Sequence, residues 1–169
     1  MRRDRESLVR SEAFQDLIPH NHCFGCGPNN PRGLRIKSSW AGHQLSVARF
    51  TPEPYHCAGP THFVNGGILA TVIDCHCVCT AAAAAYRDSG REIGSEPHLH
   101  YATANLELHY RRPTPIGTEL ELTAQIVDRT DRTYVLSCEL TAGGKTTVTA
   151  RLEAIQVPES RVLGNNVAT

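Results

Sequence analysis

The chain is organised around one apolar stretch, Phe63-Val64-Asn65-Gly66-Gly67-Ile68-Leu69-Ala70-Thr71-Val72-Ile73-Asp74-Cys75-His76-Cys77-Val78-Cys79-Thr80, which the five alanines Ala81 to Ala85 extend. These residues leave almost no polar face, which is typical of a helix that is covered on most sides. Asn65 is a suitable N-cap before two glycines, and the residues from Tyr86 to Gly90 provide a stop signal. We therefore predict a buried central helix that starts at Gly66.

One ionisable carboxylate, that of Asp74, lies two turns inside this apolar run. A buried carboxylate is costly unless it is paired or hydrogen-bonded, and such groups concentrate at functional sites. The helix start at Gly66 offers backbone amides and the positive end of the helix dipole to a carbonyl oxygen. Eight residues of helix separate these two groups by roughly 12 Å along the axis and about 80° around it, so one chain cannot bring both to one reacting carbon. Two antiparallel helices related by a two-fold axis could, which indicates a dimeric site.

The composition bounds the function. A chain of 169 residues with 17 basic and 17 acidic side chains indicates one domain, and its charge favours neither nucleic acid nor an anionic membrane surface as a partner. Because Asp74 and His76 interrupt the apolar run, we expect no membrane span, and the first six residues do not resemble a signal peptide. Seven cysteines, three of them between Cys75 and Cys79, do not resemble a secreted disulfide framework. We expect a reduced, cytoplasmic protein.

Alternating patterns predict two strands before the helix and four after it. The first two cover residues 34–40 and 44–50, and the last three centre on residues 120–126, 134–140 and 148–154. Between them, residues 102–110 alternate as a half-buried strand, with Ala102, Ala104 and Leu106 on the apolar face and Thr103 on the polar one. Short turns favour an antiparallel sheet, so the fold class is α+β, with a curved sheet cradling the helix. We divide the chain into an N-terminal extension (1–22), a domain (23–157) and a flexible tail (158–169).

The sequence resembles the hotdog-fold acyl-CoA thioesterases of the phenylacetate-degradation and 4-hydroxybenzoyl-CoA thioesterase type over roughly residues 23 to 157. Three stretches carry the resemblance: Asn65-Gly66-Gly67 followed by Asp74, the strand end and turn from Tyr110 to Leu120, and Cys23-Phe24-Gly25-Cys26-Gly27 with Asn30-Pro31 and Gly33-Leu34. It implies hydrolysis of an acyl-CoA-type thioester, with no cofactor, by a homodimer or a dimer of dimers.

The resemblance also implies roles for single residues. It places the carbonyl-polarising amide at Gly66, the catalytic carboxylate at Asp74 and a water-holding hydroxyl at Thr103. Asp74 would act either as the nucleophile or as the base that activates a water. The remaining catalytic position of the motif is Asn65. We assign substrate binding to a further set of residues: Gly67, His62, Arg111 and Arg112. Together with Arg32, the two arginines could hold the phosphates of a CoA carrier because guanidinium matches phosphate geometry, and solvation of a strand end is an equally good account of them.

Two positions depart from the family pattern. The usual histidine is Asn65 here, and the polar residue expected a few positions earlier is replaced by Gly59, for which His56, Thr61 or His62 are possible substitutes. These departures leave two alternatives open. One is a non-catalytic protein that binds an acyl or CoA group, and the other is a hotdog enoyl-CoA hydratase or dehydratase.

The cysteine-rich opening allows a metal site. Cys23 and Cys26 have the spacing of half a zinc site, and His20 and His22 could complete four ligands. The usual second Cys-x-x-Cys pair is missing, and the family resemblance accounts for this loop without a metal, so we assign none. Cys75 and Cys79 share a helix face, and we interpret them as core residues.

Overall fold

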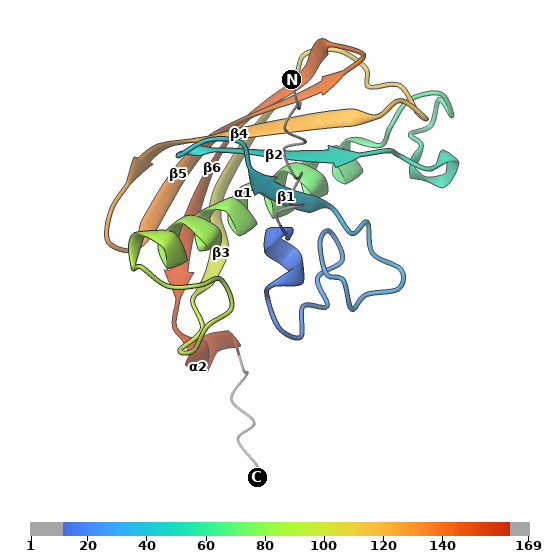
Figure 1. The fold of residues 1–169 in the computed structure, drawn as a ribbon. Coiled ribbons are helices and arrows are strands. Elements are labelled where there is room, and N and C mark those ends of the chain that lie inside the picture. Colours follow the sequence, from blue (N-terminus) through green and yellow to red (C-terminus); the bar gives the residue numbers. More distant parts are fainter. Residues whose placement is uncertain (1–11, 163–169) are drawn as a thin grey trace, which may run out of the picture.

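A computed structural model describes residues 12–162, and it has six strands and one long helix in the predicted order (Figure 1). The strands are β1 (Lys37–Trp40) and β2 (Leu45–Phe50), followed after the helix by β3 (His100–Tyr110), β4 (Leu120–Arg129), β5 (Thr133–Ala142) and β6 (Lys145–Val157). The long helix is α1 (Gly66–Asp88), and short helical segments are η1 (Phe14–Asp16), η2 (Pro54–His56) and α2 (Glu159–Val162). All strand pairs are antiparallel, in the order β1-β2-β4-β5-β6-β3.

The sheet curves around α1, which lies against its concave face (Figure 1). Leucines that alternate along β4, β5 and β6 point at the helix and are fully buried: Leu120, Leu122, Leu136, Leu140 and Leu152. The helix meets them with Val72, Ile73 and a run of alanines whose small side chains let the sheet approach closely. This architecture confirms the predicted α+β hotdog fold.

The expectation that no stretch reaches membrane-spanning length is wrong for α1. The 23-residue helix is long and apolar enough to cross a bilayer by length and composition, and Asp74 within it does not change that. Most of the helix is buried within the domain, because the sheet covers it. In this structure its apolar character therefore serves the core.

Part of the segment assigned to an N-terminal extension packs into the domain. Phe14 of η1 lies against Trp40, with 5.0 Å between the ring centroids, and it is 2% exposed. Residues 1–11 of that extension and residues 163–169 of the expected flexible tail lie outside the described residues. Within the tail, α2 follows directly after β6.

A buried polar network ties η1 and β1 to α1. Gln15 donates to the Ser38 hydroxyl and accepts from the Ser38 amide, each over 2.8 Å. The Ser38 hydroxyl lies 2.8 Å from Nδ1 of His76, and the Ser46 hydroxyl lies 3.4 Å from Nε2 of the same ring. Because His76 is fully buried, burial lowers its pKa to about 4, so the ring is neutral at physiological pH.

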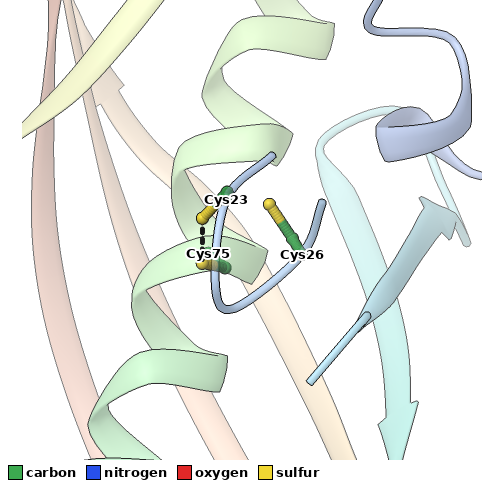
Figure 2. A group of neighbouring side chains, drawn as sticks. All are labelled: Cys23, Cys26 and Cys75. Carbon is green, nitrogen blue, oxygen red and sulfur yellow. Dashed lines mark hydrogen bonds between the residues drawn. The ribbon is translucent and has the colours of Figure 1, made fainter. Parts of the chain in front are cut away.

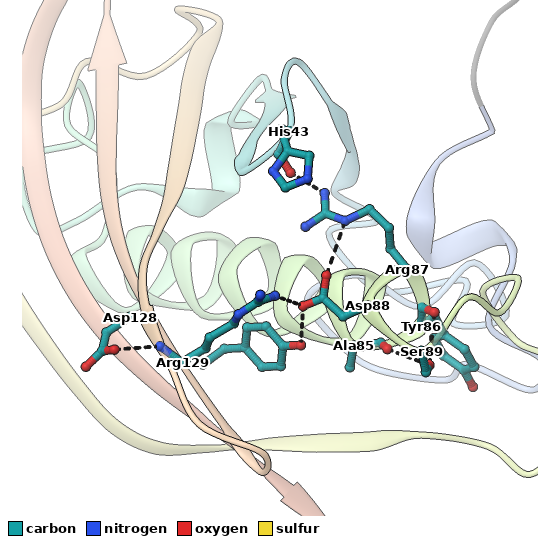
Figure 3. Close-up of polar contacts among 9 residues, drawn as sticks. His43, Ala85, Tyr86, Arg87, Asp88, Ser89, Asp128 and Arg129 are labelled. Carbon is teal, nitrogen blue, oxygen red and sulfur yellow. Dashed lines mark hydrogen bonds and ion pairs between the residues drawn. The ribbon is translucent and has the colours of Figure 1, made fainter.

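Polar contacts also fix the C-terminal end of α1 (Figure 3). Asp88 accepts a hydrogen bond from the Tyr134 hydroxyl over 2.9 Å and pairs with Arg129 of β4. The neighbouring residue of the helix, Arg87, donates a hydrogen bond to the backbone carbonyl of His43, which lies in the turn between β1 and β2. With this end of the helix anchored, its last turn has a defined position relative to the sheet.

Candidate active site

The start of α1 presents one free backbone amide. Asn65 is the N-cap, and its side-chain oxygen accepts a hydrogen bond from the Gly67 amide over 2.8 Å. Because that capping oxygen is used at Gly67, the Gly66 amide has no hydrogen-bond acceptor among residues 12–162. It lies at the positive end of a 23-residue helix, where a carbonyl oxygen or oxyanion is stabilised. The structure gives Asn65 a capping role, which positions this amide.

Sequence reasoning missed one neighbour of Gly66. The Tyr110 hydroxyl, at the end of β3, donates to the Gly66 carbonyl over 2.8 Å, and a Cβ added to Gly66 would lie 3.4 Å from the tyrosine ring. Tyr110 stood in the alternating pattern of β3 as an ordinary apolar-face residue. No sequence signal connects it with a glycine 44 residues earlier.

Asp74 lies on the α1 face that meets β3 and is half-buried. The Thr103 hydroxyl of β3 donates a hydrogen bond to its carboxylate. Burial raises the pKa of Asp74 above its usual range, and the Thr103 hydrogen bond opposes part of that rise. The structure thus brings together Asp74 and Thr103, the two residues to which the family resemblance gave the carboxylate and hydroxyl roles.

A β-bulge explains how Thr103 reaches the helix. The predicted alternation placed Ala102 and Ala104 on the apolar face with Leu106, and Thr103 on the other. In the structure, the register of β3 against β6 shifts between Thr103 and Asn105, so Thr103 pairs with Ala154 and Leu106 with Leu152. Both partners are fully buried on the helix-facing side of β6. The predicted alternation was therefore wrong at Ala102 and Ala104. An extra residue in the strand exchanges the two faces of the sheet for the side chains that precede it.

The solvent exposure of β3 also differs from the prediction. It was expected to be half-buried, yet Ala102, Thr103, Ala104 and Asn105 are all exposed. The reason is topological, since among residues 12–162 β3 is an edge strand that pairs with β6 on one side. An exposed edge of this length offers unpaired backbone groups to another chain.

A cavity of about 400 Å³ opens beside Asp74 and Thr103. Much of its wall is apolar: Val78, Ala82, Leu99 and Val157. Its volume and apolar lining suit a small organic or acyl group. A neighbouring cavity of about 470 Å³ lies around the charged C-terminal end of α1, but it contains neither Asp74 nor the helix start.

The expected substrate-binding residues gather at the helix start, away from Asp74. The loop before α1 is joined to the turn after β3, because the Val64 amide donates to the Thr114 carbonyl and the Ile116 amide to the His62 carbonyl, over 2.8 and 2.9 Å. His62 is exposed on this loop, next to exposed Gly67.

Both arginines of the expected set are at the same end of the domain. Arg111 and Arg112 directly follow β3 and are exposed. The Arg111 side chain donates to the Thr149 hydroxyl over 3.1 Å. Guanidinium groups are suited to binding phosphate.

The loop positions that could replace Gly59 differ in availability. His56 is buried, and its Nδ1 accepts the Glu53 amide over 2.9 Å, so it caps η2 and is not free for substrate. Thr61 and His62 are both exposed.

The four possible metal ligands named from the sequence do not all lie together. Cys23 and Cys26 do lie close together, but the third ligand-type side chain in their group is Cys75 of α1. His20 and His22 are exposed and belong to no such group among residues 12–162. Cys75 is buried in the core, as interpreted from its sequence, and its sulfur lies 3.6 Å from that of Cys23 in the loop.

A curved antiparallel sheet wrapped around one helix, with an acidic side chain on that helix, defines a hotdog protein with a candidate site on α1. The family model for the thioesterase superfamily matches residues 61–149, which is more than half of the chain. The chain therefore belongs to the thioesterase superfamily.

Individual relatives agree with this membership. The chain is 32% identical over 94 residues to the acyl-coenzyme A thioesterase THEM4 of Xenopus laevis, a match that covers 56% of this chain and 36% of that protein. It thus spans about a third of the length of this curated relative. A solved thioesterase superfamily protein from Shewanella loihica PV-4 is 34% identical, with 82% of this chain and 96% of that chain covered and a TM-score of 0.61. The E. coli PaaI protein from the phenylacetic acid degradation operon is 18% identical, with 74% of this chain and 81% of that chain covered and a TM-score of 0.60. At this identity the match shows a likeness of fold alone.

Proposed function

We propose that this protein hydrolyses an acyl-CoA-type thioester. The observation that carries the proposal is the pairing of Asp74 with Thr103 at the wall of an apolar cavity, on a helix whose first amide is free. Membership of the thioesterase superfamily and the similarity to an acyl-coenzyme A thioesterase support it.

The chemistry follows from these groups. The thioester carbonyl oxygen accepts the Gly66 amide, which stabilises the negative charge that develops on that oxygen. Asp74 either attacks the carbonyl carbon itself or removes a proton from an attacking water. The carbon–sulfur bond then breaks, and the sulfur leaves with the bonding electrons and takes up a proton. If water is the nucleophile, this step gives the carboxylic acid directly. If Asp74 is the nucleophile, a water hydrolyses the resulting anhydride in a second step.

Each complete site is built from two chains in this proposal. Gly66 and Asp74 of one helix are separated by about 12 Å along its axis, which exceeds the reach of one carbonyl group. A two-fold axis that sets two α1 helices antiparallel brings Gly66 of one subunit opposite Asp74 of the other, as an isologous interface requires. The exposed edge of β3 and the exposed residues at the start of α1 lie on the face that such a partner would cover.

The substrate is divided between two regions. The acyl group enters the cavity beside Asp74, and the CoA moiety extends past the helix start. There Arg111 and Arg112 pair with its phosphates, and His62 and Gly67 line the entrance. The apolar cavity wall favours acyl groups with apolar carbon chains or rings.

A thiol-release assay tests the proposal. Wild-type protein, Asp74→Asn and the control Asp128→Asn, which makes the same chemical change at an exposed site on β4, are incubated with a panel of acyl-CoAs. We expect free CoA from the wild type and the control, and none above background from Asp74→Asn.

The assay also separates the alternatives. Wild-type protein that binds acyl-CoAs in a calorimeter but releases no thiol would be a binding protein. Loss of the enoyl absorbance without thiol release would identify a hydratase. Either result overturns the proposal.

A further inference from the structure

Four of the seven cysteines meet where the loop Cys23–Gly27, here called the cysteine loop, lies against α1. The sulfur of Cys23 is 3.6 Å from that of Cys75, and the sulfur of Cys26 is 3.8 Å from that of Cys79. The sulfurs of Cys23, Cys26 and Cys75, which form the three-thiol group, all lie within 4.8 Å of one another (Figure 2). All seven cysteines are free thiols.

These separations match those of ligands around one tetrahedral ion. Zinc–sulfur bonds of about 2.3 Å at tetrahedral angles place neighbouring sulfurs about 3.8 Å apart. The two closest sulfur pairs, at 3.6 and 3.8 Å, have this spacing without any rearrangement of the backbone. Cys79 is the nearest side chain able to supply a fourth sulfur.

The cysteine loop packs closely against the helix at Gly25. A Cβ added to Gly25 would lie 2.2 Å from the Cys75 sulfur, so any larger residue would push the loop off α1. On its other side the loop is tied down, because the amides of Leu34 and Ile36 donate to the carbonyls of Phe24 and Gly25 over 2.7 and 3.1 Å. The sulfur positions are therefore set by the backbone, as in a pre-organised ligand set.

A side-chain amide also contacts the three-thiol group. The side-chain amide of Asn21 donates to the Cys26 sulfur over 3.7 Å, which is an outer contact typical of thiolate ligands. Three sulfurs this close together, two of them buried, offer the ligand atoms that a soft cation prefers.

We propose that Cys23, Cys26 and Cys75 bind one soft divalent cation, zinc being the best fit, with Cys79 as the nearest fourth ligand. Thiolate ligands select zinc over the hard cations magnesium and calcium. The ion would clamp the cysteine loop to α1 one residue from Asp74, and Cys23, Cys26, Cys75 and Cys79 line the same cavity as that carboxylate. Such a site would organise that wall of the cavity.

Metal analysis of the full chain tests this proposal. Protein purified under reducing conditions without a chelator should carry about one zinc per chain, the stoichiometry of a single structural site. Replacing the zinc with cobalt should give the visible bands of tetrahedral cobalt and the near-ultraviolet bands of cobalt–thiolate bonds. The cobalt spectrum needs no variant, so it stays informative if a substitution impairs folding.

Variants locate the ion. Cys23→Ser changes the exposed member of the group and should abolish zinc binding and the cobalt–thiolate bands, whereas the control Cys57→Ser, a partly exposed cysteine outside the group, should retain both. The proposal is overturned if reduced wild-type protein binds neither ion, or if Cys23→Ser retains its zinc. It is also overturned if mass spectrometry finds a disulfide between Cys23 and Cys75 in metal-free protein as purified.

Discussion

Replacing Gly66 with proline would remove the proposed carbonyl-polarising amide and little else. Gly66 is the first residue of α1, where proline is well tolerated because the amide there has no partner within the helix. The residue before a proline must be extended, and Asn65 already is, with φ −60° and ψ 133°. The Gly66 amide makes no hydrogen bond among residues 12–162 that the substitution would break.

The expected effect on the reaction is large, and that on stability is small. Losing one donor to an oxyanion lowers kcat by about 100- to 1,000-fold. The free energy of unfolding should stay the same or rise by about 0.4–1 kcal/mol, because proline restricts the unfolded chain. Gly66→Ala is the matched control, since it adds a Cβ at 3.4 Å from the Tyr110 ring, as proline does, but keeps the amide.

The assay is steady-state thiol release by wild type, Gly66→Pro and Gly66→Ala, together with thermal unfolding of all three. We predict that only the proline variant loses kcat, with its melting temperature unchanged or higher. Equal activity of the proline and alanine variants would refute the role assigned to this amide.

Three further predictions concern single side chains. Thr103→Val should lower kcat/KM by about 10- to 100-fold, because it removes a hydrogen bond to the Asp74 carboxylate. Thr103→Ser keeps the hydroxyl and should retain most of the activity. Equal kcat/KM for the two variants would contradict the pairing of Thr103 with Asp74. Burial lowers the pKa of His76 from 6.5 to about 4, so between these pH values the unfolded chain binds a proton that the folded chain does not. The contribution of His76 to the free energy of unfolding should therefore be fully present above pH 6.5 and fall by about 3 kcal/mol as the pH drops to 4. Denaturant titrations at several pH values should find this dependence reduced in His76→Gln. Gly25→Ala should cost about 1–3 kcal/mol of unfolding free energy, whereas Gly59→Ala, with open space around it, should cost little.

Much of the fold follows from local patterns. The central helix is recognisable because a helix buried on most sides contains almost only apolar residues, and Asn65 marks its start. The strands of the sheet follow from alternation, and their pairing from short turns. These features depend on neighbours in sequence, which is why they can be read without coordinates.

The details that decide the site depend on long-range contacts. The bulge at Ala104 turns Thr103 toward Asp74, yet no residue type near Ala104 announces an extra residue. The thiol of Cys75 faces a loop 52 residues earlier in the chain. From sequence alone, the neighbouring metal-ligand candidates for Cys23 and Cys26 are the histidines His20 and His22. The hydroxyl of Tyr110 reaches Gly66 only because β3 crosses the helix.

Mixing two inactive variants tests most directly whether each site is shared by two chains. Gly66→Pro and Asp74→Asn chains are produced together with different tags, and the hybrid species is purified and assayed. In the purified hybrid dimer, one of the two sites combines an intact Gly66 with an intact Asp74, so activity should recover to about half of the wild-type value. No recovery in verified hybrids would contradict the shared site.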